Sequence, residues 1–477
     1  MCSQDSSNVL QRHFFPMSIQ VRFYSAICAV SLLFSLTGCA SVPRVDKHTI
    51  VRLYAEQRSL PKKHPVIFVP GMMGSVLTDV KTGRTVWGAV GGVAVDVLAL
   101  PIDSVTLFLN RDDLVPTRTM AKFSWVPGIV EKKVYEDIYR IAVEAGGFEK
   151  DVSVFALSYD WRRDLVEAVQ QLDALIQVIK EKTGNPDIKI NLVCHSSGGL
   201  IARYYIKYGN SDVLNEDVLP PPTYAGAHNI NKVIMLGVPN TGSMESFQKL
   251  HEGLWLPTIV RIRPHVAFTM PSLYELMPFD GQPGFVDAAG VFQNLDLYDA
   301  DTWLRYGWSI FHPLYTSKLR QSLRSEYGKV KGQQMFDEKM NKERRFLEMV
   351  LQRAKRFHEA LWNGDLTEEK RRINYILLGS DCQPTLKRAE LIKRSWGWET
   401  LFKSGKPLVS DKLYGFGDRS VTKDSLIGLR YIDYGLTTQK IFRFPASYSG
   451  FVCENHMELV SSPTYMDNLL NLLLMDE

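Results

Sequence analysis

Five short runs of apolar and β-branched residues recur along the chain, and segments with helical spacing separate them. The runs are PVIFVPG (65–71), VSVFALSYDW (152–161), IKINLVCHS (188–196), KVIMLGVPN (232–240) and INYILLGSD (373–381). Their apolar residues are continuous rather than alternating, which is typical of strands that are buried on both faces of a parallel sheet. The runs therefore predict a parallel sheet inside a globular domain.

A helix is predicted between the second and third runs. The segment DLVEAVQQLDALIQVIKEKTG (164–184) has apolar residues at helical spacing, begins at an aspartate and ends at a glycine. Strands that alternate with helices in this way predict an α/β fold with a mostly parallel, doubly wound sheet.

Two regions break this alternation. Residues 241–370 contain an aromatic and proline-rich part, LWLPTIVRIRPHVAFTMPSLYELMPF, and then a charged helical part, KMNKERRFLEMVLQRAKRFHEALW. This region is predicted to be an inserted cap, in which Trp255, Phe268 and Leu273 are candidates for a lid or an acyl-chain pocket, unless they only pack the cap. Residues 84–125 are predicted to be a second, smaller excursion.

The N-terminal segment is typical of a secretion signal. RFYSAICAVSLLFSLTGCAS has a basic lead-in, an apolar run too short for a membrane span, and a small-residue end. LTGC (36–39) resembles a bacterial lipobox, which predicts that Cys39 is lipidated; an ordinary signal with a coincidental cysteine is the alternative. Ala40 stands where aspartate would retain a Gram-negative lipoprotein in the inner membrane, so a lipid anchor in the outer membrane of the cell envelope is predicted. Met17 is an alternative start.

The domain boundaries follow from these patterns. Residues 1–38 are the predicted signal peptide, 39–63 a polar and basic tether, and 64–477 the globular domain with its insertion. The net charge of the 477-residue chain is only +4 and the charges are interspersed, so nucleic acid is not a predicted partner. The predicted partners are a lipid or ester substrate and a membrane reached through the lipid anchor, and the oligomeric state is left open.

The chain has six cysteines. Those at positions 2 and 28 would leave with the signal peptide and Cys39 would be acylated, so that Cys194, Cys382 and Cys453 remain. Three cysteines in an oxidising compartment permit one disulfide at most, and a Cys382–Cys453 bridge is left open. Since no cysteines show zinc-type spacing, no metal site and no cofactor are predicted.

The stretch NLVCHSSGGL has the form of a nucleophile elbow, which is a strand, a tight turn that carries a serine, and an immediate helix. The turn requires small residues two positions before and after the serine, because strand and helix pass close together. With Ser196 as nucleophile these positions hold Cys194 and Gly198. With Ser197 the first position would hold His195, which is too large. Ser196 is therefore the predicted nucleophile, Ser197 is predicted to offer its backbone N–H to an oxyanion, and His195 is predicted to pack away from the chemistry.

A serine hydroxyl requires a general base held by a carboxylate, and donors for the developing oxyanion. In α/β-hydrolases these partners follow in the order serine, acid, histidine. Downstream, YGFGDRSV contains Asp418 and CENHMELV contains His456, and upstream Met72 follows the first strand in a glycine turn. Asp418 is the predicted acid, His456 the base, and the N–H of Met72 the second oxyanion donor. Asp381, which also ends a strand, is the main rival for the acid, and Asp424 is a more distant one.

Seven motifs occur together in the order of a known family. They are PGMMGS (70–75), YDWR (159–162), CHSSGG (194–199), LGVPNTGS (236–243), PSLYELMP (271–278), GDRSV (417–421) and NHMEL (455–459). With them the chain resembles the lecithin:cholesterol acyltransferase-like family of α/β-hydrolases, which includes phospholipases and phospholipid-dependent acyltransferases. The resemblance implies an α/β-hydrolase fold with a cap, the triad Ser196, Asp418 and His456, and the oxyanion donors Met72 and Ser197.

The chain departs from the family pattern in two places. Cys194 stands where many members carry glycine or alanine, and Arg419 and Ser420 stand where the family usually has a smaller residue and threonine, which puts the shape of that loop in question. In YDWR, Asp160 and Arg162 are predicted to brace a loop rather than to contact substrate.

These patterns together predict a lipid-anchored serine hydrolase that cleaves or transfers the acyl chains of lipid esters through an acyl-enzyme. Hydrolysis and transfer use the same triad, so the acceptor is left open. The alternatives are a carboxylesterase or thioesterase for small soluble esters, and a lipid-binding scaffold lipoprotein without turnover.

Overall fold

The computed structural model describes residues 64–88, 95–120, 122–126, 130–133, 135–255, 261–282, 284–433 and 439–475, together with Arg52, Ala55 and Glu56. The side chains of residues 122–133, 432–433 and 439–441 are not among those described. The predicted signal peptide and Cys39 lie outside these ranges, so lipidation and envelope location stay predictions. Within the described ranges, no helix is both long and apolar enough to cross a membrane.

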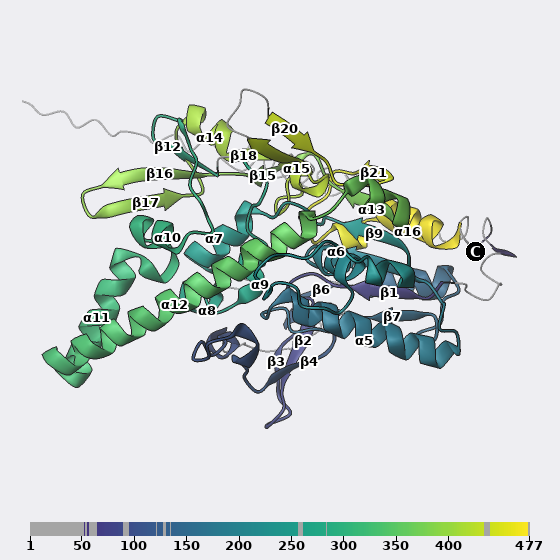
Figure 1. The fold of residues 1–477 in the computed structure, drawn as a ribbon, viewed down its shortest axis with the longest axis horizontal. Coiled ribbons are helices and arrows are strands. Elements are labelled where there is room, and N and C mark those ends of the chain that lie inside the picture. Colours follow the sequence, from purple (N-terminus) through teal and green to yellow (C-terminus); the bar gives the residue numbers. More distant parts are fainter. Residues whose placement is uncertain are drawn as a thin grey trace, which may run out of the picture. The chain divides into compact units, whose positions relative to one another are not determined.

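The five apolar runs form one parallel sheet with a sixth strand (Figure 1). The strand order is β21-β14-β9-β8-β1-β7, and every neighbouring pair is parallel. The strands are β1 (Val66–Val69), β7 (Val154–Ala156), β8 (Ile190–His195), β9 (Ile230–Leu236), β14 (Asn374–Gly379) and β21 (Tyr448–Phe451). Every residue of β1 and β8 is buried, as the continuous apolar runs predict. The predicted α/β fold with a mostly parallel sheet is confirmed.

Helix α5 (Leu165–Thr183) connects β7 to β8 and has the predicted ends. The side chain of Asp164 accepts a hydrogen bond from the N–H of Val166, and Gly184 ends the helix in the left-handed conformation with φ 62°. Helix α6 (Gly198–Tyr208) follows β8 after a turn of two residues. Helix α5, which leads into β8 and the serine pair, therefore begins and ends where the local sequence predicts.

The direction of the connections reverses within the sheet. From β1 the chain moves to β7, whereas from β7 it crosses back to β8 and on to β9. Because such crossovers are right-handed, α4 (Glu136–Arg140) and helix η3 (Ile141–Ala145) of the first connection lie on the face opposite α5 and α6, and α16 (Pro463–Leu474) packs on η3. The reversal falls between β1 and β8, and ligands of α/β sheets bind at the carboxyl ends of strands at such a switch point.

Between β9 and β14 the described chain adds no strand to the central sheet. This insertion contains α7 (Met244–Glu252), β10 (Leu254–Trp255), β11 (Arg261–Ile262), α8 (Pro264–Ala267), α9 (Pro271–Glu275), β12 (Phe285–Asp287), β13 (Phe292–Gln293), α10 (Ala300–Tyr306), η5 (Ser309–Phe311), α11 (Pro313–Tyr327), α12 (Lys329–Trp362) and α13 (Leu366–Arg372). Helices α11 and α12 lie side by side, and α12 also packs on α6 and α9 (Figure 1). The aromatic part of the insertion thereby lies near the helix that begins at the elbow.

The smaller predicted excursion, residues 84–125, contributes to a separate sheet. Here β2 (Ser75–Asp79) pairs with β3 (Thr85–Trp87) and β4 (Leu114–Thr119). The remaining elements of the described chain are η1 (Val95–Leu98), η2 (Leu107–Leu109), β5 (Lys122–Val126), β6 (Val130–Lys133), η4 (Ala225–Asn229), β15 (Gln383–Leu386), β16 (Ala389–Arg394), β17 (Gly397–Leu401), α14 (Pro407–Leu413), β18 (Tyr414–Gly417), α15 (Lys423–Leu426), β19 (Arg430–Asp433), β20 (Gln439–Phe442) and η6 (Leu459–Ser461).

Candidate active site

Ser196 lies in a strained turn between β8 and α6. Its φ is 53°, a left-handed value that a side chain rarely adopts and that holds the serine out of the strand. A Cβ added to Gly198 would lie 2.3 Å from the carbonyl oxygen of Val69, so only glycine fits there. Cys194 is fully buried with a free thiol, and burial raises its pKa. The turn therefore requires small residues two positions before and two positions after Ser196, as the sequence suggested.

Ser196, His456 and Asp418 form one line of hydrogen bonds. The Ser196 hydroxyl donates to Nε2 of His456 over 3.0 Å, and Nδ1–H of His456 donates to Oδ2 of Asp418 over 2.7 Å. Asp418 follows β18 and His456 follows β21, so the three groups come from three separate segments. The backbone N–H of His456 also donates to the carbonyl of Asp418 over 2.8 Å, which ties the two loops together.

The carboxylate of Asp418 is buried and its orientation is fixed. Its Oδ1 accepts the N–H groups of Ser420 at 2.9 Å and Val421 at 2.6 Å, which leaves Oδ2 for His456. Gly237, with φ 57°, lies beside the pair: a Cβ there would come within 3.0 Å of Asp418 Oδ2 and 3.1 Å of His456 Nδ1. Arg419 takes the left-handed conformation, with φ 79°, and donates its N–H to Thr385 Oγ1 over 2.9 Å. The unusual Arg-Ser sequence therefore closes the loop without displacing the acid.

The charges around His456 favour its protonated form. Burial by itself would lower its pKa, but the attraction and hydrogen bond of Asp418, with a smaller contribution from Glu245, raise the pKa above its ordinary value, while Lys249 opposes them. Glu245 and Lys249 lie on α7 with Nζ and Oε1 3.1 Å apart. Burial opposes the ionisation of Glu245, but Lys249 and a hydrogen bond with Ser420 lower its pKa. No sequence pattern indicates these two residues, because only the fold brings α7 to the site.

The two predicted oxyanion donors lie beside the serine. Met72 lines the same cavity as Ser196, and among the described residues the N–H groups of Met72 and Ser197 have no hydrogen-bond partner. The Ser197 hydroxyl lies 3.1 Å from the Tyr159 hydroxyl, which donates in turn to the carbonyl of Pro70 over 3.0 Å. Because this contact occupies its side chain, Ser197 offers the site only its backbone N–H.

A cavity of about 280 Å³ opens in front of Ser196 and His456. Its apolar lining residues are Met72, Met73, Trp87, Met120, Leu254, Trp255, Leu273, Leu276, Val421 and Met457. Its polar lining residues include Ser243, Glu245, Ser246, Lys249 and Ser420. Trp255 is 63% exposed and Leu273 is buried. The cavity thus offers contacts both to an apolar chain and to a polar group of one substrate.

One residue of the proposed acyl pocket does not line the cavity. Phe268 is 1% exposed and packs in the core against Tyr274, Phe311 and Phe346, with ring centroids 5.4 Å apart for the closest pair. Phe268 therefore only packs the cap, which is the alternative that the sequence left open. An aromatic-rich segment contains both core and lining residues, and the sequence alone does not separate them.

The rival acids lie elsewhere. Asp381 pairs with Lys423 over 2.9 Å and Asp424 pairs with Lys387 over 2.9 Å, whereas the hydrogen bond of His456 Nδ1 goes to Asp418. Among the described residues, no group of three His, Cys, Asp or Glu side chains could hold a metal ion.

The predicted loop brace has the expected geometry. The guanidinium of Arg162 is fully buried and pairs with Asp160 over 2.7 Å and with Asp112 over 2.6 Å. Neither Asp160 nor Arg162 lines the cavity in front of Ser196. The structure therefore favours bracing over substrate contact for this pair.

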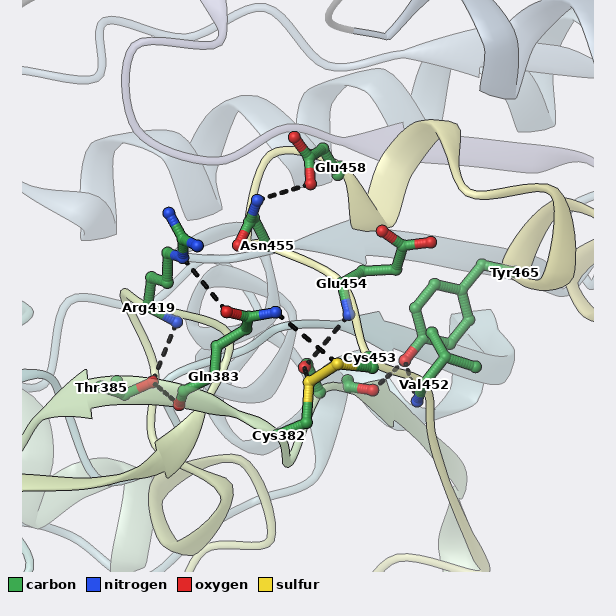
Figure 2. Close-up of a disulfide and its surroundings, with 12 residues drawn as sticks. Cys382, Gln383, Thr385, Arg419, Val452, Cys453, Glu454, Asn455, Glu458 and Tyr465 are labelled. Atoms are coloured by element: carbon green, nitrogen blue, oxygen red, sulfur yellow. Dashed lines mark hydrogen bonds between the residues drawn. A yellow bond between two sulfur atoms is a disulfide. The ribbon is translucent and has the colours of Figure 1, made fainter. Parts of the chain in front are cut away.

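A disulfide joins Cys382 to Cys453 (Figure 2), a bridge that the sequence left open. Cys453 lies three residues before His456, and Cys382 directly precedes β15. Strand β15 pairs with β18, which leads to Asp418, and Thr385 in β15 accepts the N–H of Arg419. One short segment thus contacts both the loop of the acid and the loop of the base.

Replacing both cysteines by serine is expected to destabilise the fold by roughly 2 to 5 kcal/mol, because the bridge closes a long loop in the unfolded chain; the sequence separation is 71. Urea unfolding of oxidised wild type and of Cys382→Ser/Cys453→Ser measures this difference. Dithiothreitol should destabilise the wild type by the same amount and leave the double variant unchanged. Equal stability of the oxidised wild type and the double variant would contradict the expectation.

His195 is placed differently from its prediction. It is 1% exposed, as a packing residue should be, but its ring also lines the cavity and lies 4.7 Å, centroid to centroid, from the ring of His456. It does not contact Asp418 as a base would. The sequence shows only that His195 is adjacent to Ser196. It does not show which residues the ring of His195 contacts.

Comparison with known proteins gives one family and several solved structures. Residues 124–302 match the family model described as lecithin:cholesterol acyltransferase. This range includes Ser196 and ends before Asp418 and His456. No curated protein sequence matches the chain significantly.

The solved structures share low sequence identity with the chain. A chain of the Tle4–Tli4 complex is 15% identical with a TM-score of 0.48, and the alignment covers 86% of this chain and 98% of that one. The mature form of the lipase BlEst2 from Bacillus licheniformis is 12% identical, TM-score 0.34, covering 87% and 93%. EstA from Clostridium botulinum is 12% identical, TM-score 0.31, covering 91% and 98%.

The geometry of the structure itself establishes the parallel sheet and the elbow. The family match adds evidence from the sequence for the same fold. The predicted resemblance is confirmed: over residues 124–302 this chain is similar to the lecithin:cholesterol acyltransferase family of α/β-hydrolases.

Proposed function

We propose that the chain is a serine enzyme that cleaves or transfers the acyl chains of lipid esters through an acyl-enzyme. The observation that carries the proposal is the line of hydrogen bonds from Ser196 through His456 to Asp418, which opens on a largely apolar cavity. The family match supports the coarser class of acyl-ester hydrolase or acyltransferase.

In the first half of the reaction, Ser196 Oγ attacks the ester carbonyl carbon while its proton passes to Nε2 of His456. Asp418 holds Nδ1–H and stabilises the imidazolium. The N–H groups of Met72 and Ser197 donate to the oxyanion that forms on the carbonyl oxygen. The carbon–oxygen bond to the alcohol then breaks, and His456 returns the proton to the departing oxygen.

In the second half, an oxygen nucleophile attacks the acyl group on Ser196, again giving its proton to His456. If the nucleophile is water, a fatty acid leaves and the reaction is hydrolysis. If it is a second alcohol, a new ester leaves and the reaction is transfer. In both cases the proton returns to Ser196 Oγ as its bond to the acyl carbon breaks, so the free enzyme is restored.

The lining of the cavity supports a lipid ester over a small soluble one. Four methionines, Met72, Met73, Met120 and Met457, line it. Their flexible, polarisable side chains adapt to the changing shape of an acyl chain. The exposed indole of Trp255 extends the apolar lining to the surface. A carboxylesterase for short esters would need far less of this surface.

A panel of p-nitrophenyl acetate, butyrate, octanoate and palmitate, with a phospholipid and a triglyceride, tests the proposal. Hydrolysis should favour the longer chains, and a fluorophosphonate should label the wild type and not Ser196→Ala. Preference for acetate would support the small-ester alternative. If no ester is cleaved and no label is bound, the chain is a scaffold and the proposal fails. Adding a long-chain alcohol and looking for new esters separates transfer from hydrolysis.

The pH dependence of kcat/KM should show an acidic limb with its midpoint above 6.5, since the pKa of His456 is raised above that value. Below the midpoint His456 is protonated and cannot accept the Ser196 proton, so the rate should fall about tenfold per pH unit. Asp418 and Glu245 favour the protonated form, whereas burial and Lys249 oppose it. Glu245→Gln should therefore move the midpoint to lower pH. A wild-type midpoint at or below 6.5 would contradict this assignment.

A further inference from the structure

His195 makes two hydrogen bonds on opposite sides of its ring. Its Nε2–H donates to the backbone carbonyl of His456 over 3.2 Å, and its Nδ1 accepts from the hydroxyl of Tyr135 over 2.9 Å. Burial, with the neighbouring charge of His456, holds the pKa of His195 well below its ordinary value. The ring is therefore neutral, and a neutral ring can donate on one side while it accepts on the other.

Tyr135 extends this series of hydrogen bonds to the loop that follows β1. Its hydroxyl oxygen accepts the backbone N–H of Gly71 over 3.0 Å, and the side chain is 1% exposed. Gly71 directly precedes Met72, and a Cβ added to Gly71 would lie 2.7 Å from the Cβ of Ser196. The loop that carries the Met72 N–H thus lies against the nucleophile, and Tyr135 holds it by its backbone.

We propose that His195 and Tyr135 form a positioning bridge, a chain of three hydrogen bonds from the Gly71 N–H to the His456 carbonyl. The bridge rests on the proposed function and adds to it, because neither residue reacts. It holds the oxyanion loop, which follows β1, and the base loop, which follows β21, at fixed positions on the two sides of Ser196. The physical reason is geometric: nucleophile, base and oxyanion donors must meet within a fraction of an ångström, and small displacements cost rate.

The competing explanation is that His195 only fills space beneath the turn. A matched pair of variants separates the two. In His195→Asn the shorter amide reaches the position of Nδ1, so it keeps a partner for Tyr135 and loses the bond to His456. In His195→Gln the longer amide reaches the position of Nε2, so it keeps that bond and loses the acceptor for the Tyr135 hydroxyl. Tyr135→Phe removes both bonds of the hydroxyl and keeps the ring packing against Phe68, at 4.6 Å between centroids.

The rate at which an ethoxyfluorophosphonate modifies Ser196 distinguishes the two explanations. It can be measured without knowing the substrate. His195→Asn and Tyr135→Phe should react about 10 to 100 times more slowly than wild type, since each leaves a buried backbone group unpaired at the site. His195→Gln also breaks the bridge, at the bond from the Tyr135 hydroxyl, but it leaves both backbone groups paired, so its rate should lie between those of the wild type and His195→Asn. With a p-nitrophenyl ester the loss in His195→Asn should fall on kcat, with KM little changed.

Ring ¹⁵N NMR of the protein labelled at histidine tests the bridge without any reaction. The signal that disappears in His195→Asn should report a neutral ring with its proton on Nε2 near neutral pH, and Tyr135→Phe should shift its Nδ1 resonance. If the wild type is not modified by the fluorophosphonate, the proposed function fails, and the NMR result alone decides the bridge. A charged ring or the opposite tautomer would overturn the bridge. Equal rates for the Asn and Gln variants, or rate losses that follow only their melting temperatures, would also overturn it.

Discussion

Ser196→Ala is expected to lower kcat for ester cleavage by roughly four to six orders of magnitude, because the variant has no oxygen nucleophile on the elbow. His456 would lose the donor that lies 3.0 Å from its Nε2. The oxyanion donors and the cavity would remain, so a small activity from direct attack by water is expected above the uncatalysed rate. Steady-state kinetics on the best ester of the panel measure the loss, with mass spectrometry of the fluorophosphonate-labelled peptide to locate the adduct.

Ser197→Ala is the matched control for this substitution. It keeps the backbone N–H that is assigned to the oxyanion and removes only the hydroxyl contact with Tyr159 at 3.1 Å. The loss of one such hydrogen bond should reduce the rate by about tenfold at most. An adduct on Ser197, or a Ser197→Ala variant as inactive as Ser196→Ala, would show that the nucleophile has been assigned to the wrong serine.

The central sheet was largely predictable because its strands are buried on both faces. Continuous apolar runs such as those of β1 and β8 have no other common explanation in a chain with alternating helices. Strand β21 was not predicted. It lies at the edge of the sheet with the sequence YSGF, which is partly exposed and has no apolar run. Its position depends on pairing with β14, and pairing is not encoded in a local pattern.

The choice of serine was predictable for a different reason. The elbow is a local steric problem, and the sizes of Cys194, His195 and Gly198 decide it without knowledge of the fold. The acid was harder to assign, since Asp381 and Asp418 both follow strands. The fold separates them because Gly237, at the end of β9, leaves room for the Asp418 carboxylate beside His456.

The parts of the site that the sequence did not predict all depend on contacts between distant segments. Glu245 acts on His456 from the cap, and Tyr135 reaches His195 from the connection between β1 and β7. None of these residues stands in a pattern of its own. The switch point between β1 and β8 explains why they meet here: the loops after both strands open at one edge of the sheet, where neighbouring connections diverge.

Asp418→Asn should lower kcat by about four orders of magnitude near neutral pH, and the reason lies in the two backbone donors of the loop. The N–H groups of Ser420 and Val421 point at Oδ1, so the amide oxygen of the new side chain would take that position. Its NH₂ group would then face Nδ1 of His456 and donate to it. His456 would carry its proton on Nε2 instead, and Nε2 could not accept the proton of Ser196.

This explanation predicts that the variant folds but that His456 carries its proton on the wrong ring nitrogen. Asp418→Asn should keep a melting temperature close to that of the wild type, because the backbone bonds to the loop survive, and it should react with the fluorophosphonate as slowly as it turns over esters. The control is Asp381→Asn, which removes only a partly exposed ion pair with Lys423 and should change kcat by no more than about twofold. The opposite result, with Asp381→Asn inactive and Asp418→Asn active, would move the acid to the end of β14 and require His456 to turn away from the hydrogen bond that it makes here at 2.7 Å.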